Sequence, residues 1–501
     1  MSSPVLIAGG GPTGLMLAGE LALAGVRSVV LEKLATPPKE SRGMTLHARA
    51  IETLQQRGLW DRFPKEDIPE WHRVHFSLFW LDLDDLGEHE YTLLLPQWRT
   101  ERFLEQRALE LGVDIRRGHE VLGFEQDADG VTVRVATASG EEELRGSYLV
   151  GCDGGGSTVR KLAGIDFPAS GHTYYGVVGD VEIPDGGSDH VAPGLYPAGT
   201  FGITVTSPGQ HRLTAIEFDG NPPPKGTPVT LDELRGAIRR VIGDEPKIDK
   251  VHWLSRFVNT TRLAAHYRAD RVFLAGDSAH VHFPATGQGL NVGMQDAMNL
   301  GWKLAAEING WAPDGLLDTY HSERHPVGRE VCMNTQAQMA LMHPLDRVGP
   351  LRELFGELVK FDEVKRYLVN MVTGLSSRYA MDYADRPGDG PEAHPLLGRR
   401  VPDAPLETEG DGPATVSRTQ HAGRPVVLDL SGGTAELGDL TAWSDRVEVV
   451  TAAPTAKIDA AVLVIRPDGH VAWADRTGSD TEGLHLALAA WFGPSTATSG
   501  R

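Results

Sequence analysis

The sequence is poor in cysteine. Only Cys152 and Cys332 occur, far apart in the chain, and they form no CxxC pair. A disulfide framework and a dithiol redox site are therefore excluded, because each needs paired cysteines. The same scarcity is typical of a reducing compartment, so we expect a cytoplasmic protein.

Long apolar runs and an excess of basic charge are also missing. No uncharged apolar run reaches the length of about 18 residues that a membrane-spanning helix needs. The chain has 48 basic and 68 acidic residues, a net charge of -20, so we expect neither nucleic acid nor an anionic membrane as a partner. The apolar N-terminus lacks a basic segment and contains Glu20, so it does not predict a signal peptide.

Glycine, by contrast, is concentrated in motifs. The chain has 501 residues, enough for about two or three domains. Residues 4–8 (PVLIA) predict a buried strand, residues 15–24 a helix, and residues 28–31 (SVVL) a second strand. The stretch GGGPTG lies between the first strand and the helix, which is the order of a βαβ unit.

The first motif predicts a bound dinucleotide. Gly9, Gly11 and Gly14 fit GxGxxG, whose glycines let the backbone approach a pyrophosphate at a helix N-terminus. Glu32 would accept hydrogen bonds from ribose hydroxyls and disfavours a 2′-phosphate. FAD and NAD(H) both fit the motif, and the alternative is a plain tight turn.

Two further motifs follow predicted strands. Residues 151–160 read GCDGGGSTVR and contain Asp153 and Arg160, while Asp277 lies in LAGDSAH. An acid at a strand end can bind a sugar or ribityl hydroxyl. The alternatives are a loop capped by Asp153 and a helix N-cap at Asp277.

The rest of the chain divides by pattern. Residues 121–135 predict a hairpin, and residues 174–218 a mostly antiparallel sheet. The sequence from Thr230 to Glu233 predicts a capping box, and residues 289–309 a long helix. The composition of residues 386–425 predicts a linker, followed by a small C-terminal α/β domain.

Together the three motifs resemble those of the class A flavoprotein aromatic hydroxylases, which have the para-hydroxybenzoate hydroxylase fold. The resemblance is strongest to bacterial aromatic polyketide hydroxylases and rifamycin-type monooxygenases, and it covers about residues 4–345. The tail, with HPLLGRR at 394–400, is similar to the thioredoxin-like C-terminal domain of that subgroup. Without a CxxC pair, that domain would have no redox role here.

The resemblance implies an α/β fold with a Rossmann-like FAD-binding domain of the glutathione-reductase type. A mostly antiparallel β-sheet substrate domain is inserted into it, and a thioredoxin-like domain follows. The implied boundaries are 1–170 and 265–385 for the FAD-binding domain, 171–264 with parts of 70–100 for the middle domain, and 395–495 for the last.

The resemblance also implies FAD contacts at the positions that match the family's motifs. Thr13 and Gly14 would lie at the pyrophosphate, Glu32 and Lys33 at the adenosine ribose, and Val121 at adenine. Those expected nearer the flavin are Arg42, Gln97, Asp277, Pro284, Gly287, Gly289, Leu290 and Asn291. Asp153 and Arg160 would serve FAD or NAD(P)H.

The implied activity is hydroxylation of a polycyclic aromatic, polyketide-type phenol with NAD(P)H, NADPH being favoured, and O2, through a flavin C4a-hydroperoxide. No catalytic base is assigned, and a monomer or homodimer is expected. Alternatives are a rifamycin-type antibiotic-inactivating monooxygenase, a Baeyer–Villiger oxygenase and a non-catalytic FAD-binding protein.

Aromatic residues of the middle region are candidates for the substrate pocket, core packing being the alternative for each. They are Tyr174, Tyr175, Tyr196, Phe201, Phe218 and Phe283.

His280 and His282 have the spacing of strand neighbours that could share a metal. A third ligand would have to come from elsewhere, and the best candidates are His321, Glu323 and His325, which nothing in the sequence brings near. We therefore expect no metal, and packing beside the cofactor for both histidines.

Overall fold

The structure is a computed structural model. It describes residues 3–38, 41, 43–63, 65, 68–84, 90–171, 174–207, 209–224, 226–382, 393–410 and 412–494.

A six-stranded sheet forms the centre of the N-terminal part, and its neighbouring strands are parallel except for the first pair. In spatial order its strands are β19 (Arg268–Ala269), β20 (Val272–Leu274), β12 (Tyr148–Gly151), β1 (Val5–Ala8), β2 (Ser28–Glu32) and β8 (Asp114–Arg117). The strands predicted from short apolar runs are confirmed. Such runs are typical of parallel strands that are covered on both faces.

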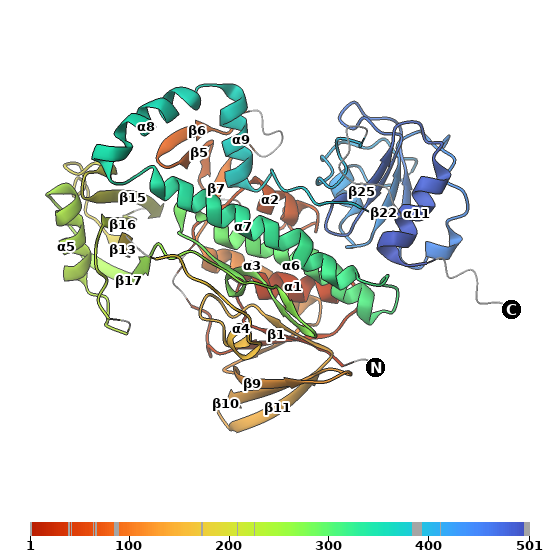
Figure 1. The fold of residues 1–501 in the computed structure, drawn as a ribbon, viewed down its shortest axis with the longest axis horizontal. Coiled ribbons are helices and arrows are strands. Elements are labelled where there is room, and N and C mark those ends of the chain that lie inside the picture. The colour runs from red at the N-terminus through yellow and green to blue at the C-terminus, as the bar shows by residue number, and fades with distance from the viewer. Residues whose placement is uncertain are drawn as a thin grey trace.

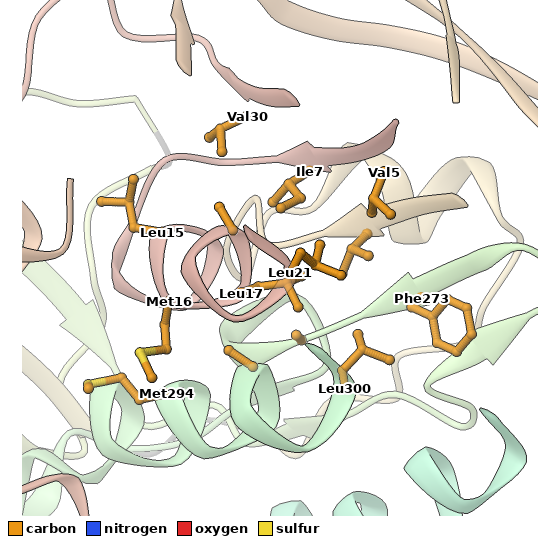
Figure 2. Packing of buried hydrophobic residues seen from close by; sticks show 14 of the residues in the cluster. Val5, Ile7, Leu15, Met16, Leu17, Leu21, Val30, Phe273, Met294 and Leu300 are labelled. Carbon is orange, nitrogen blue, oxygen red and sulfur yellow. The ribbon is translucent and has the colours of Figure 1, made fainter. Parts of the chain in front are cut away.

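Helix α1 (Pro12–Leu23) lies between this sheet and α6 (Gln288–Ile308), and it also packs against α3 (Gln97–Glu110). Figure 2 shows its apolar side chains between Ile7 of the sheet and Met294 of α6. The helix begins at Pro12 rather than at the predicted residue 15, because Gly11 is its N-cap and proline suits the first helical position. The long helix predicted over 289–309 is confirmed as α6.

An antiparallel three-stranded sheet contains the predicted hairpin. Its strands are β9 (Glu120–Gln126), β10 (Val131–Thr137) and β11 (Gly140–Gly146). The short helix α4 (Thr158–Leu162) contacts β9.

The middle sheet is antiparallel throughout, as predicted. Its order is β14 (Gly194–Tyr196), β15 (Gly199–Ser207), β16 (Gln210–Phe218), β13 (Tyr174–Glu182) and β17 (Lys250–Val258). Helix α5 (Leu231–Ile242) packs on one face and is capped by Thr230, whose Oγ1 accepts from the Glu233 N–H at 3.2 Å. Figure 1 shows this unit at one end of the molecule.

The remaining elements of the N-terminal part are short strands and helices. The strands are β3 (Thr45–Leu46), β4 (Glu70–Trp71), β5 (Arg73–Phe76), β6 (Phe79–Asp82), β7 (Thr92–Leu94), β18 (Arg262–Leu263) and β21 (His280–Val281). The 3-10 turns are η1 (Gly276–Ser278), η2 (Ala285–Gly287) and η3 (Leu316–Asp318). The helices are α2 (Ala48–Gln55), α7 (Thr319–Ala340), α8 (Leu345–Leu358) and α9 (Asp362–Thr373).

The C-terminal unit is a four-stranded mixed sheet, at the opposite end of the molecule from α5 in Figure 1. Its order is β23 (Glu448–Thr451), β22 (Val426–Asp429), β24 (Val462–Ile465) and β25 (Val471–Asp475). The helical segments are α10 (Val416–Thr419), η4 (Thr441–Trp443) and α11 (Thr481–Phe492).

The linker predicted over 386–425 is wrong for most of its length. Val401, Leu406 and Val416 are buried in one core with Leu428 and Leu463 of the C-terminal sheet. The segment therefore belongs to the C-terminal unit; its proline, glycine and charge content hid the few apolar side chains that anchor it. Residues 386–392 and 411 lie outside the described residues.

Across the part of the chain that the structure describes, no helix combines the length and the apolar character needed to cross a bilayer.

Candidate cofactor and substrate site

Two glycines of the first motif are required by packing, and one faces open space. A Cβ built on Gly9 would lie 2.3 Å from the Cys152 carbonyl oxygen, and one on Gly14 would lie 2.1 Å from the Gly9 oxygen. A Cβ built on Gly11 would have no other heavy atom within 4 Å, apart from its chain neighbours. The N-terminus of α1 has no side-chain cap, so its first N–H groups remain available there. This cradle fits a pyrophosphate.

Glu32, at the end of β2, is tied to the same loop. Its Oε2 accepts from the Gly10 N–H at 2.7 Å, and its Oε1 from the Leu34 N–H at 2.8 Å. An ionised carboxylate has about four acceptor positions, so ribose hydroxyls can still bind. Lys33 is exposed beside it, and Val121 is buried on β9.

Thr13 is the point where the first and third motifs meet. A Cβ on Gly276 would lie 2.7 Å from Thr13 Oγ1, and one on Gly293 of α6 would lie 2.3 Å from it. The next residue, Asp277, is exposed, and its carboxylate lies beside Gly289 and His282. The tertiary structure thus brings the glycine loop, the Gly276–Asp277 turn and α6 together.

In the second motif, Asp153 and Arg160 both form hydrogen bonds within the protein. The Asp153 carboxylate accepts from Ser157 Oγ and from the Thr158 and Val159 N–H groups, which caps α4. Arg160 donates to the Ser278 carbonyl at 2.8 Å. The capped loop is therefore present, and it holds the 276–278 turn from the side. A ligand role for Asp153 and Arg160 stays a prediction.

The start of α6 is held by polar contacts that the sequence did not reveal. Asn291 Nδ2 donates to the Thr45 and Gly287 carbonyls, and its Oδ1 accepts from the His47 N–H. Thr286 and Gly287 have φ of 60° and 71°. A Cβ on Gly287 would lie 2.0 Å from Thr45 Oγ1, so only glycine fits.

His47 completes this clamp. Its Nε2 lies 2.6 Å from the Thr286 carbonyl, which can only accept, so Nε2 carries the proton. Burial lowers the pKa of His47 to about 4, and the bond to Thr286 opposes this only in part. His47 is therefore neutral at pH 7. Its pairing with residues more than 200 positions away left no signal in the sequence.

Gln97 lies next to the segment that contains Arg42. Its Oε1 accepts from the Gly43 N–H at 3.1 Å and its Nε2 donates to Glu101. Arg42 itself lies outside the described residues. Pro284 precedes η2, and Leu290 lies in the first turn of α6.

The two histidines have separate partners. His280 is fully buried and donates from Nε2 to Asp296 Oδ2 at 2.8 Å, while His282 Nδ1 donates to the Phe283 carbonyl. The described residues contain no group of three or more His, Cys, Asp or Glu side chains arranged to hold a metal.

Glu323 of the HSERH segment is bonded to Arg466 and Lys303 instead. The rings of His321 and His325 both contact Tyr267, which also contacts His280. The two segments are thus closer than the sequence suggested.

The aromatic candidates divide between the two faces of the middle sheet. Tyr175 and Phe201 are buried in a core with α5, and Tyr196 packs against that core. Phe218 instead forms a cluster with Tyr174 on the other face, where Phe283 packs from the loop before η2. Alternate residues of a strand point to opposite faces, which separates Tyr174 from Tyr175. The packing of Tyr175, Phe201 and, in part, Tyr196 thus matches the alternative of core packing, and a pocket role for them stays a prediction.

The chain matches two known protein families. The family described as "FAD binding domain" matches residues 2–335, and "Aromatic-ring hydroxylase, C-terminal" matches residues 394–495.

Several relatives match the chain from end to end. A 12-dehydrotetracycline 5-monooxygenase/anhydrotetracycline 6-monooxygenase of Streptomyces rimosus is 45% identical, covering 99% of both chains. A rifampicin monooxygenase of Streptomyces venezuelae is 43% identical over 98% of this chain and 99% of the relative. A dialkyldecalin synthase of Streptomyces rugosporus is 42% identical over 99% of this chain and all of the relative.

Among solved structures, the OxyS anhydrotetracycline hydroxylase from Streptomyces rimosus superposes with a TM-score of 0.90 at 45% identity. The match covers 99% of this chain and 100% of that one.

Proposed function

This chain belongs to the FAD-binding family of aromatic-ring hydroxylases, and on that basis we propose that it hydroxylates a polycyclic aromatic phenol, using NAD(P)H and O2. It is a flavin-dependent monooxygenase by family. The observation that carries the proposal is the meeting of the glycine loop, the Gly276–Asp277 turn and α6 around Thr13. That geometry provides adjacent helix N-termini for a long, anionic cofactor.

Bound FAD supplies the redox chemistry and the activation of oxygen, and the protein supplies binding and orientation. We assign the pyrophosphate to Gly9, Gly11, Thr13 and Gly14, with Glu32 and Lys33 at the ribose and Val121 at adenine. Asp277 takes the ribityl side. Arg42 is assigned to the flavin side, Gln97 to the ribityl–phosphate portion, and Asp153 and Arg160 to FAD or NAD(P)H.

The start of α6, from Pro284 through Gly287, Gly289, Leu290 and Asn291, borders the ring in this proposal. Its free N–H groups and dipole stabilise negative charge by roughly 0.3–1 kcal/mol. The clamp of His47 and Asn291 keeps these groups in place before the ring binds.

In this proposal the substrate lies between this helix start and the face of the middle sheet that carries Phe218, with Phe283 beside it on the loop before η2. Both side chains are buried and belong to the cluster that contains Ala285 of η2. NADPH is the favoured reductant, and a monomer or homodimer is expected. Residues 395–495 are assigned to a thioredoxin-like domain without a redox role, and the cytoplasm stays the expected compartment.

Antibiotic inactivation is the second candidate, favoured by the relative named as a rifampicin monooxygenase. The purified protein, incubated with NADPH, is offered anhydrotetracycline-type polyketides and rifampicin. NADPH consumption, peroxide release and product mass are recorded. We expect substrate-stimulated NADPH oxidation and a product heavier by one oxygen atom.

Other outcomes decide against the proposal. A colourless protein that takes up no FAD would remove the whole assignment. A substrate that is converted at unchanged mass without NADPH oxidation would place the chain with the synthase-type relative instead.

A further inference from the structure

Asp296 of α6 is fully buried and lies at the centre of a polar network that the proposed chemistry does not use. Its Oδ2 accepts from the Gly276 N–H at 3.0 Å and from His280 Nε2 at 2.8 Å. Its Oδ1 accepts from Arg324 Nε at 2.7 Å. Burial alone would raise the pKa of Asp296, but Arg324 and His280 hold it below its ordinary value, so the side chain is an anion.

Arg324 of α7 carries the network toward the C-terminal unit. Its side chain is also fully buried, and its Nη1 donates to Tyr379 Oη at 2.9 Å. If either member of the ion pair between Arg324 and Asp296 were removed, solvent could not reach the other to replace it. In such surroundings each donor depends on its own acceptor.

Tyr379 lies where the two parts meet, in one buried cluster with Val292 of α6, Val327 of α7 and Val427 of the C-terminal sheet. Its N–H donates to the Gly398 carbonyl at 2.9 Å, and its ring stacks on His470 with centroids 4.1 Å apart. Gly398 and His470 both belong to the unit whose core contains Val401 and Leu428. Tyr379, Arg324 and Asp296 thus form one continuous connection from that unit to the Gly276–Asp277 turn.

The turn needs such a support. Gly276 has φ of 63°, and its Cα is packed against Thr13. The carboxylate of Asp277 is exposed and forms no hydrogen bond or ion pair within the described part of the chain. Its direction is therefore set by the backbone of the turn, and Asp296 holds that backbone from inside.

We propose that Asp296 is a positioning residue for the cofactor and that Arg324 and Tyr379 make its action depend on the C-terminal unit. The C-terminal unit thereby sets how tightly the chain retains FAD, although it contributes no contact to FAD. This proposal rests on the assignment of Asp277 to the cofactor site.

Tyr379→Phe tests the connection, because it removes only Oη and leaves the ring on His470. FAD released on dilution of the full-length holoenzyme, measured by flavin fluorescence, gives the Kd. We expect Tyr379→Phe to raise the Kd by about fivefold or more, the lower end of typical coupling between distant sites. Asp296→Asn is expected to raise it further.

A double-mutant cycle separates positioning from general loosening. If Tyr379 acts through Asp296, the double variant Tyr379→Phe with Asp296→Asn has about the Kd of Asp296→Asn alone. Thr419→Val is the matched control, since it removes two buried hydrogen bonds elsewhere in the C-terminal unit: Thr419 Oγ1 donates to the Val416 carbonyl and accepts from Gln420 Nε2. It is expected to lower the unfolding temperature without changing the Kd.

Asp277→Asn distinguishes failure of this proposal from failure of the site assignment. If Asp277→Asn weakens FAD binding while Tyr379→Phe changes the Kd by less than about twofold, the connection is refuted and the site stands. An unchanged Kd in Asp277→Asn removes the site assignment itself. Additive effects of the two substitutions on the Kd would also overturn the role of Tyr379. If Asp296→Asn does not fold, the Kd of Tyr379→Phe alone tests the connection.

Discussion

At the residue scale, three acids at the carboxyl ends of strands differ in what their carboxylates bind. Asp153 uses its carboxylate to cap α4, Glu32 divides its oxygens between two backbone N–H groups, and Asp277 is left open. All three are acids at or just after the carboxyl end of a strand in the same sheet. The neighbouring donors decide whether a carboxylate is available to a ligand.

Glu32→Gln should weaken FAD binding by roughly tenfold or more, because a charged acceptor is replaced by a neutral one with a single acceptor oxygen. The Kd of FAD measured by dilution checks this. Glu125→Gln, on the exposed edge of β9, is the control and should leave the Kd unchanged. Equal values for Glu32→Gln and the parent would remove Glu32 from the ribose site.

His47 predicts a pH dependence of stability. Its pKa falls from 6.5 to about 4 on folding, so between these values the unfolded chain binds a proton that the folded chain does not. The free energy of unfolding is therefore highest above pH 6.5 as far as His47 is concerned. It decreases as the pH falls toward 4, by about 3 kcal/mol in all.

Glutamine does not titrate, so the His47→Gln variant does not show this decrease in unfolding free energy at low pH. At pH 7 the variant is less stable than the parent, because the hydrogen bonds of the His47 ring are lost. The gap in unfolding free energy, measured by urea titration at pH 7, 6 and 5, should narrow as the pH falls. Replacement of the exposed His190 by Gln should not change the slope. A gap that is constant with pH would show that His47 titrates normally in the folded protein.

At the element scale, the glycines of one motif have different tasks. Gly9 and Gly14 are required because another side chain would collide with backbone oxygens, and Gly11 keeps a space open. The start of α6 similarly depends on Gly287, where Thr45 leaves no room for a Cβ.

Gly11→Ala should leave the fold intact and weaken FAD binding, because its methyl would fill the space assigned to the pyrophosphate. The unfolding temperature of the FAD-free chain and the Kd of FAD are the two measurements. Gly19→Ala, within the same helix and also without neighbours, should stabilise the helix by up to about 1 kcal/mol and leave the Kd unchanged. A Gly11→Ala variant that binds FAD normally would contradict the assignment.

At the scale of the whole molecule, the C-terminal unit is joined to the rest by buried ionic groups. Arg466 donates to Glu323 and Asp468, and Lys303 donates to Glu323, all of them nearly or fully inaccessible. Arg57 adds bonds to two C-terminal carbonyls, those of Gln420 and Pro467. The unit is therefore part of the folded body and not an appendage.

Arg466→Met should destabilise the chain by about 3–5 kcal/mol, because two buried carboxylates lose their main partner. The exposed pair of Arg476 and Asp459 provides the control: Arg476→Met should cost about 1 kcal/mol at most. Urea unfolding followed by tryptophan fluorescence compares the two variants. Similar losses in both would mean that the buried network contributes little.

Much of the fold and part of the site follow from local patterns. The strand and glycine turn at the N-terminus, the long helix after the third motif and the cap at Thr230 appear where predicted, and the first helix begins three residues earlier than predicted. Each depends on residues within a few positions of one another. His47, Asp296 and Tyr379 could not be found this way, because their partners lie far away in sequence or on another unit.

The sequence by itself determined the kind of cofactor loop and the family, because glycine spacing and the acid after β2 are local requirements of a dinucleotide site. Only the tertiary structure decided that Asp277 is left open, that Phe218 and Phe283 cluster with Ala285 of η2, and that Val401, Leu406 and Val416 belong to the C-terminal core. The reason is physical: burial and hydrogen-bond partners are properties of distant segments brought together, and no local pattern contains them.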